Sequence, residues 1–150
     1  MNTPSGQRLR YPGLLPRAVS LLAALCLAAP PSRPEVVVVV AHNSPIRDLS
    51  DREIADVFLG KLSRLPGVGA VVPLDQMEGG AARNEFYMKL TGKSPAQVRS
   101  FWSKVIFTGR GRPPRILAND AAVIRALRVN PGAIGYVSRA STDAGVRILR

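Results

Sequence analysis

Five successive valines, Val36 to Val40, followed by Ala41, most constrain how this chain can fold. Branching at Cβ favours extended backbone, so the run predicts a β-strand over residues 35–41. The apolar residues do not alternate with polar ones, which indicates that both faces of the strand are covered. We therefore predict a central strand in an α/β sheet.

Four helices are predicted along the remainder of the chain. Each has a polar cap, a glycine stop or apolar residues at helical spacing. In the second helix the apolar positions are Ala82, Phe86 and Leu90, and in the third they include Trp102, which we assign to the core. The residues that mark the helix ends are Ser50, Glu53, Gly60, Gly92, Ser94, Pro95 and Asp120, the last as the expected cap of the fourth helix.

Two further strands are predicted over residues 70–74 and 133–137, and residues 146–149 alternate as an edge strand does. Residues 109–115 have no periodicity and are expected to form an exposed loop. Alternation of strands with helices predicts an α/β fold with right-handed crossovers.

The N-terminal segment predicts export. Three arginines, Arg8, Arg10 and Arg17, precede an apolar run over residues 18–29 that contains the single cysteine, Cys26. A run of this length is shorter than the roughly 20 residues that cross a bilayer, and it suits a secretory signal peptide. We therefore expect a cleaved signal over residues 1–29 and a periplasmic or secreted protein. An uncleaved anchor is the alternative.

Residues 30–34 are expected to form a proline-rich linker, and residues 35–150 one domain. The whole chain has a formal charge of +11, and removal of the signal would leave 18 bases and 10 acids, a net charge of +8. This charge favours anionic partners. The predicted export and the scattered placement of the bases argue against nucleic acid.

Three segments resemble the substrate-binding proteins of phosphate-type ABC transporters. Residues 56–61 read Asp-Val-Phe-Leu-Gly-Lys, and residues 131–137 read Pro-Gly-Ala-Ile-Gly-Tyr-Val. Between them, Val72-Pro73 leads into a glycine-containing loop that precedes Phe86. The resemblance covers nearly the whole expected domain and implies one lobe of a two-lobed binding protein. The implied fold class is α/β, a periplasmic-binding-protein-like single lobe with a mixed sheet flanked by helices.

The resemblance implies a solute-binding role for an oxyanion such as phosphate, with an ABC transporter permease or another envelope protein as a partner. The implied ligand residues lie at the start of the second helix. There, backbone amides can hold an anion and glycine permits close approach. An ordinary strand-to-helix turn is the alternative, and residues 76–83 contain no hydroxyl side chain. The candidate ligand residues are Gly79, Gly80, Ala81, Ala82 and Arg83, with Asp75 and Glu78 nearby.

Arg110, Arg112 and Arg115 form the densest basic cluster in the sequence. Their planar guanidinium groups suit docking to an acidic partner, and a solvated loop is the alternative reading. If the cluster docks a partner, the chain could be a non-catalytic envelope interaction module that binds a membrane or sensor protein without tight solute binding.

Residues after the central strand are minor ligand candidates, because α/β proteins often bind ligands beyond strand ends. These are Asn43 and Ser44, next to His42, the single histidine. No cysteine, second histidine or close acid pair supports a metal site. Ser44 has no base partner in the sequence pattern, so we expect no catalytic residue, no cofactor and no enzymatic activity.

Overall fold

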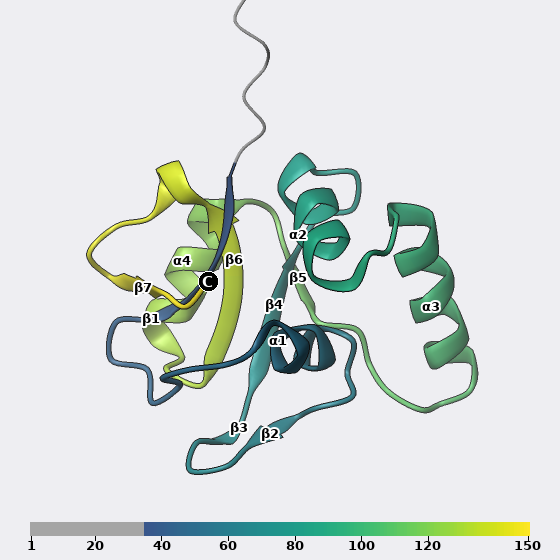
Figure 1. Ribbon diagram of the computed structural model, residues 1–150, viewed down its shortest axis with the longest axis horizontal. Coiled ribbons are helices and arrows are strands. Elements are labelled where there is room, and N and C mark those ends of the chain that lie inside the picture. Colours follow the sequence, from purple (N-terminus) through teal and green to yellow (C-terminus); the bar gives the residue numbers. More distant parts are fainter. Residues whose placement is uncertain (1–34) are drawn as a thin grey trace, which may run out of the picture. The chain divides into compact units, whose positions relative to one another are not determined.

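The computed structural model describes residues 35–150, and the predicted signal peptide and linker lie outside the described residues. The described chain contains a five-stranded sheet, a two-stranded hairpin and four α-helices (Figure 1). The elements are β1 (Val36–Ala41), α1 (Asp51–Phe58), β2 (Arg64–Leu65), β3 (Gly69–Ala70), β4 (Val72–Gln76), α2 (Ala81–Thr91), α3 (Pro95–Phe107), β5 (Arg115–Leu117), α4 (Asp120–Val129), β6 (Ala133–Ser138), the short 3-10 helix η1 (Arg139–Ser141) and β7 (Val146–Ile148).

The five strands lie in the order β5-β4-β6-β1-β7 and form a mixed sheet, as the sequence resemblance implies. β4 runs parallel to both β5 and β6, whereas β1 runs antiparallel to β6 and β7. The carboxyl ends of β4, β5 and β6 therefore meet at one edge of the sheet, and β1 ends at the opposite edge. This arrangement decides which loops can share a site.

The valine run of β1 supplies both cores, which confirms the prediction of a strand covered on both faces. Val36, Val38 and Val40 pack with residues of α1, α2 and α3. Val37 and Val39 belong to a second core that α4 covers. Every residue of β1 is buried, because helices cover the sheet on both sides (Figure 1).

The expected capping interactions are present in two helices. The Ser50 side chain accepts a hydrogen bond from the Glu53 amide at 3.3 Å, and the Glu53 carboxylate accepts one from the Ser50 amide at 2.8 Å. Ser94 begins α3 with the same reciprocal pair. The prediction for α4 is wrong by one residue. Asn119 is the cap, with its Oδ1 3.0 Å from the Ala122 amide, and Asp120 begins the helix and binds other groups.

The strand predicted over residues 70–74 is divided in the structure, because the chain changes sheets there. The Val71 amide donates to the Ser63 carbonyl at 3.0 Å, and the Val72 amide donates to the Gly132 carbonyl at 3.1 Å. The first bond belongs to the hairpin side and the second to the main sheet. As a result β3 ends before Val71, and β4 extends to Gln76, beyond the predicted end.

The loop predicted over residues 109–115 extends one residue too far. Arg115 begins β5, which pairs with β4 in parallel, and Pro114 is buried. β5 is three residues long, too short for any hydrophobic alternation to show in the sequence.

Gly135, in the segment of residues 131–137 noted above, permits close packing between the sheet and α4. A Cβ atom at this position would lie 2.6 Å from Cγ1 of Val123 and 3.6 Å from Cβ of Leu74. Real Cβ atoms do not approach other atoms as closely as 2.6 Å. The glycine therefore sets how near α4 lies to β6.

Candidate anion-binding site

The predicted anion site begins where β4 leads into α2. Gly79 and Gly80 are exposed, and Gly79 has a positive φ of 85°, which favours glycine. Gly80 is the N-cap of α2 and supplies no side-chain cap, and the first turn contains no acid. The three other α-helices of residues 35–150 all have side-chain caps.

The backbone donors of this turn are partly engaged. The Gly80 amide donates to the Met77 carbonyl at 3.3 Å, and the first helical hydrogen bond runs from the Asn84 amide to the Gly80 carbonyl at 3.1 Å. The amides of residues 81–83 precede that bond and have no capping side chain. Ala81 is exposed and Ala82 half-buried, so a small anion can approach these donors from solvent.

The sequence alone would allow Arg83 to be a freely exposed ligand residue. In the structure it is instead buried in an ion pair. Its side chain is 8% exposed, and its Nε lies 3.2 Å from Oδ2 and 3.3 Å from Oδ1 of Asp75. The carboxylate thus binds the inner nitrogen of the guanidinium. The two terminal nitrogens of Arg83 form no hydrogen bond within residues 35–150. Neither nitrogen is one of the side-chain atoms that are fully buried and also lack a hydrogen-bond partner.

Asp75 is the centre of a buried polar cluster, here called the Asp75 network, which consists of Asp75, Gln76, Arg83, Tyr87 and Tyr136. The Tyr87 hydroxyl donates to Oδ2 at 2.9 Å, the Gln76 amide donates to Oδ1 at 2.8 Å, and the Tyr136 hydroxyl also donates to Oδ1. Every member has an exposure of 8% or less. The carboxylate is therefore satisfied from several directions.

Burial and the adjacent charge of Asp75 both raise the pKa of Tyr136 and of Tyr87, so both hydroxyls remain donors. For Arg83, burial by itself would lower the pKa, but the Asp75 carboxylate outweighs it and raises the pKa above the ordinary value. Arg83 thus stays positively charged although it is buried.

The network continues to the neighbouring strand ends. Nε2 of Gln76 donates to Oδ1 of Asp120 at 2.8 Å and to the Tyr136 carbonyl at 2.9 Å. Oδ2 of Asp120 accepts the Ser141 hydroxyl at 2.7 Å and the Ser138 amide at 3.1 Å. Polar bonds therefore link the carboxyl ends of β4 and β6 to the start of α4.

Sequence reasoning identified Asp75 and Arg83 but missed Gln76, Tyr87, Tyr136 and Asp120 as their partners. One signal was available, since Asp75 and Gln76 are polar residues at the end of an otherwise apolar strand. The pairing of β4 with β6, which brings Tyr136 beside them, was not readable from the sequence.

Glu78, which would repel an anion near the turn, is neutralised by a residue of another helix. Its carboxylate forms an ion pair with the Arg99 guanidinium of α3. Both side chains are about half-exposed. The turn is therefore less negative than its sequence indicates, and α3 is linked to the loop before α2.

Asn43 and Ser44 do not join Gly80 and Arg83. They follow β1, which ends at the opposite edge of the sheet because it runs antiparallel to β6. The Ser44 side chain is fully buried and donates to the Pro131 carbonyl at 2.6 Å, while its oxygen accepts the Ile46 amide at 3.2 Å. Ser44 therefore stabilises the turn after β1, and Asn43 lies exposed beside it.

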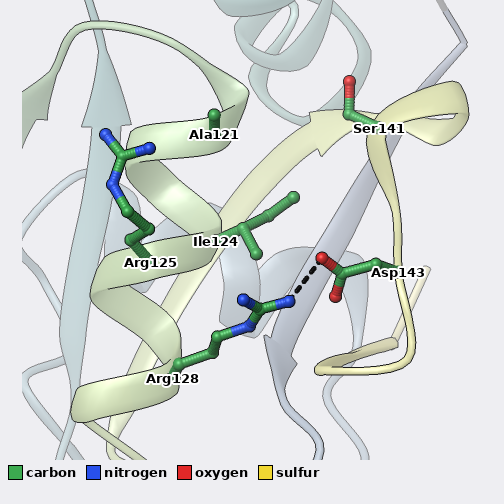
Figure 2. A pocket seen from close by; sticks show the side chains of 6 residues that line it. All are labelled: Ala121, Ile124, Arg125, Arg128, Ser141 and Asp143. Carbon is green, nitrogen blue, oxygen red and sulfur yellow. Dashed lines mark hydrogen bonds and ion pairs between the residues drawn. The ribbon is translucent and has the colours of Figure 1, made fainter.

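A hollow of about 430 Å³ lies beside α4. Figure 2 shows Arg128 extending from α4 to Asp143, with a distance of 2.6 Å between Nη2 and Oδ2, while Arg125 points away from this pair. Gly145 allows the contact, because a Cβ there would lie 2.5 Å from Nε of Arg128. Asp143 neutralises Arg128, so this arginine is not a free cation of the hollow.

The three predicted partner-binding arginines lie away from the Gly80 turn in the sequence and in the fold. Arg110 and Arg112 are exposed on the loop after α3, and Arg115 is exposed at the start of β5. None of the three pairs with a carboxylate of residues 35–150.

Within residues 35–150, no three histidine, cysteine, aspartate or glutamate side chains gather where they could hold a metal ion. The same part of the chain contains no helix with the length and apolarity needed to cross a bilayer.

Comparison with known proteins identifies the fold. A substrate-binding protein of a phosphate ABC transporter from Clostridium perfringens, solved with bound phosphate, superposes with a TM-score of 0.62 at 18% identity. It is covered over 44% of its length and 77% of this chain. An ABC-type phosphate transport receptor from Vibrio cholerae gives 0.59 at 16% identity, with 45% of that chain and 77% of this one covered. The chain has the fold of one lobe of the phosphate-type substrate-binding proteins.

The resemblance read from the sequence motifs is thus confirmed for the fold. PstS from Borrelia burgdorferi also superposes, with a TM-score of 0.53 at 15% identity over 46% of its length and 76% of this chain. This chain spans less than half the length of the three solved proteins. No family model matches the sequence, and no curated protein matches it.

Proposed function

We propose that this chain is an exported solute-binding protein that takes a small oxyanion, with phosphate as the first candidate, at the N-terminus of α2. The observation that carries the proposal is the uncapped start of that helix, in a fold shared with a protein that was solved with bound phosphate. A binding role rather than a catalytic one, a periplasmic location and delivery to an ABC transporter permease belong to the same proposal.

Backbone amides supply most of the proposed attraction. The amides of residues 81–83 point out of a helix N-terminus, where the helix dipole is equivalent to about half a positive charge. Asp75 and Arg83 together are neutral, so they add no net charge. The ion pair instead holds Arg83 in place through Nε, which leaves its two terminal nitrogens as further donors for an anion.

A one-lobe chain contacts a ligand from one side, so we expect weaker binding than in a two-lobed protein. The test is the melting temperature in phosphate, sulfate and chloride at matched ionic strength. Millimolar phosphate or sulfate should raise the melting temperature above its value in chloride, because a ligand that binds only the folded state stabilises it.

A matched pair of variants localises the effect. Ala81→Glu places a carboxylate at the first helical position, where an acid stabilises the helix but occupies and repels the anion site. Ala81→Gln has nearly the same size without the charge. The glutamate variant should lose the phosphate response and the glutamine variant should keep it. Equal responses in both variants, or none in the parent chain, would reject this site.

A further inference from the structure

The basic residues of the described chain are unevenly distributed. Residues 86–119 contain seven lysines and arginines and no acid, whereas the rest of residues 35–150 contains ten bases and ten acids. The entire net charge of this part of the chain therefore comes from one continuous segment, which covers most of α2, all of α3 and β5. Apart from Arg99, which binds Glu78, none of its cations forms an ion pair within residues 35–150.

The end of α3 combines this charge with exposed apolar side chains. Phe107 is 93% exposed and Ile106 is 55% exposed, and Lys104, Arg110 and Arg112 are exposed around them in sequence. We call these five residues the basic tip. Phe107 lies on the side of α3 away from Val98 and Trp102, which face the core, so packing within the domain does not explain it.

Two backbone hydrogen bonds join the first part of the loop after α3 to the end of that helix. The Gly109 amide donates to the Ile106 carbonyl at 3.0 Å, and the Arg110 amide donates to the Val105 carbonyl at 3.1 Å. A Cβ at Gly111 would lie 3.2 Å from Cγ1 of Val105, so the loop lies directly against α3. Arg110 and Arg112 thus lie on a loop packed against α3, and with Ile106 they help to line a hollow of about 570 Å³.

We propose that the basic tip docks this protein onto the surface of an anionic phospholipid membrane. Unpaired cations attract the negative surface, arginine forks bind lipid phosphates, and Phe107 with Ile106 enters the headgroup region. The Phe107 side chain is almost fully exposed, and a fluid bilayer accepts an exposed aromatic side chain without a matching pocket. An acidic protein partner would need a complementary cavity for Phe107, and that partner is the alternative outcome of the test.

The experiment measures co-sedimentation of the full chain with vesicles of phosphatidylcholine, with and without phosphatidylglycerol. Residues 1–34 are the same in every variant, so only differences between variants count. Binding should require phosphatidylglycerol and should weaken as salt is raised. Arg110→Gln and Arg112→Gln should each lower the partition coefficient about fivefold, and Phe107→Ala about tenfold.

Matched controls are available elsewhere in the chain. Arg125→Gln removes an exposed arginine of α4, and Val129→Ala shortens a side chain that is 83% exposed. Both should bind vesicles as the parent chain does. Ala81→Glu should also bind normally, because free phosphate and lipid phosphate are assigned to different surfaces. Normal vesicle binding by this variant without a phosphate response is the result expected if both proposals hold. A parent chain that binds vesicles but shows no phosphate response would reject only the anion site of α2.

Hydrogen–deuterium exchange locates the contact independently of residues 1–34. Amides of residues 104–112 should become protected when anionic vesicles are added, and amides of α4 should not. The proposal is overturned if protection is absent from this segment or if the tip variants bind as the controls do. It is also overturned if the tip variants lose an acidic protein partner while no variant binds vesicles.

Discussion

Arg83 and Arg112 carry the same guanidinium group in opposite surroundings. Arg83 is buried against Asp75, where two tyrosine hydroxyls complete the carboxylate's bonds, whereas Arg112 is exposed and has no carboxylate partner within residues 35–150. A buried ion pair holds parts of the fold in place, and its loss leaves a charge without water or partner. An unpaired exposed arginine stabilises little and is available to other molecules. Burial and pairing thus distinguish Arg83, which supports the fold, from exposed arginines such as Arg112, which can dock to another molecule, although all belong to one strongly basic chain.

The largest effect on stability is expected when the buried ion pair between Asp75 and Arg83 is broken. Asp75→Asn keeps the shape of the side chain but leaves Arg83 buried without a counter-charge. We expect a loss of about 3–5 kcal/mol in the free energy of unfolding, measured by urea denaturation. A loss below about 1 kcal/mol would show that water or rearrangement already compensates Arg83.

Tyr136→Phe removes one hydroxyl that donates to Asp75 and accepts from the Gln76 amide at 3.1 Å. The ring remains stacked on Phe86, with 4.0 Å between centroids, so packing should be preserved. The expected loss is about 1–3 kcal/mol, because buried polar groups lose a partner. Urea denaturation of Tyr136→Phe, of Asp75→Asn and of the double variant measures the coupling free energy between the two residues. If the losses in the free energy of unfolding are additive, the two residues do not share a network.

Alkaline pH provides a third test of the Asp75 network. The pKa values of Tyr87 and Tyr136 are raised in the folded state, so the folded protein keeps protons that the unfolded chain releases above pH about 10. Stability is therefore complete below that pH and should fall above it, by up to about 1.4 kcal/mol per pH unit for each tyrosine. Tyr136→Phe should show a shallower decline in denaturation experiments across this range, and an unchanged slope would contradict the assignment.

The smallest effect on stability is expected at the exposed side. Arg110→Gln together with Arg112→Gln should change the free energy of unfolding by less than about 0.5 kcal/mol, because neither arginine has an ion-pair partner within residues 35–150. A clear loss by the same urea assay would mean that the arginines support the loop. In that case the hydrogen–deuterium exchange of the tip, and not the vesicle binding of these variants, would decide whether the tip contacts the membrane.

Local signals in the sequence predicted much of the fold. The valine run predicted β1, and the capping residues Ser50 and Ser94 predicted the starts of α1 and α3. These features depend on neighbours within a few residues, which a sequence displays directly. β5 was missed because three residues at a sheet edge carry no periodic signal, and its partner β4 is distant along the chain.

The candidate site could be predicted only in part. The glycine turn and Arg83 were found because a strand-to-helix junction is a local feature. The partners of Arg83 depend on strand order, which sets Tyr136 beside Asp75. The antiparallel direction of β1 likewise separates Asn43 from the Gly80 turn, and nothing within the strand itself specifies that direction.

The outer strands of the sheet have a further consequence for behaviour at high concentration. β5 and β7 each have three residues, and both carry an arginine, Arg115 in one and Arg147 in the other. Pro113 and Pro114 precede β5 and cannot donate backbone hydrogen bonds. Short, charged and proline-flanked borders resist the addition of strands from a neighbouring molecule. The valine-rich interior, which in isolation would favour intermolecular β-aggregation, is thereby shielded from other copies of the chain.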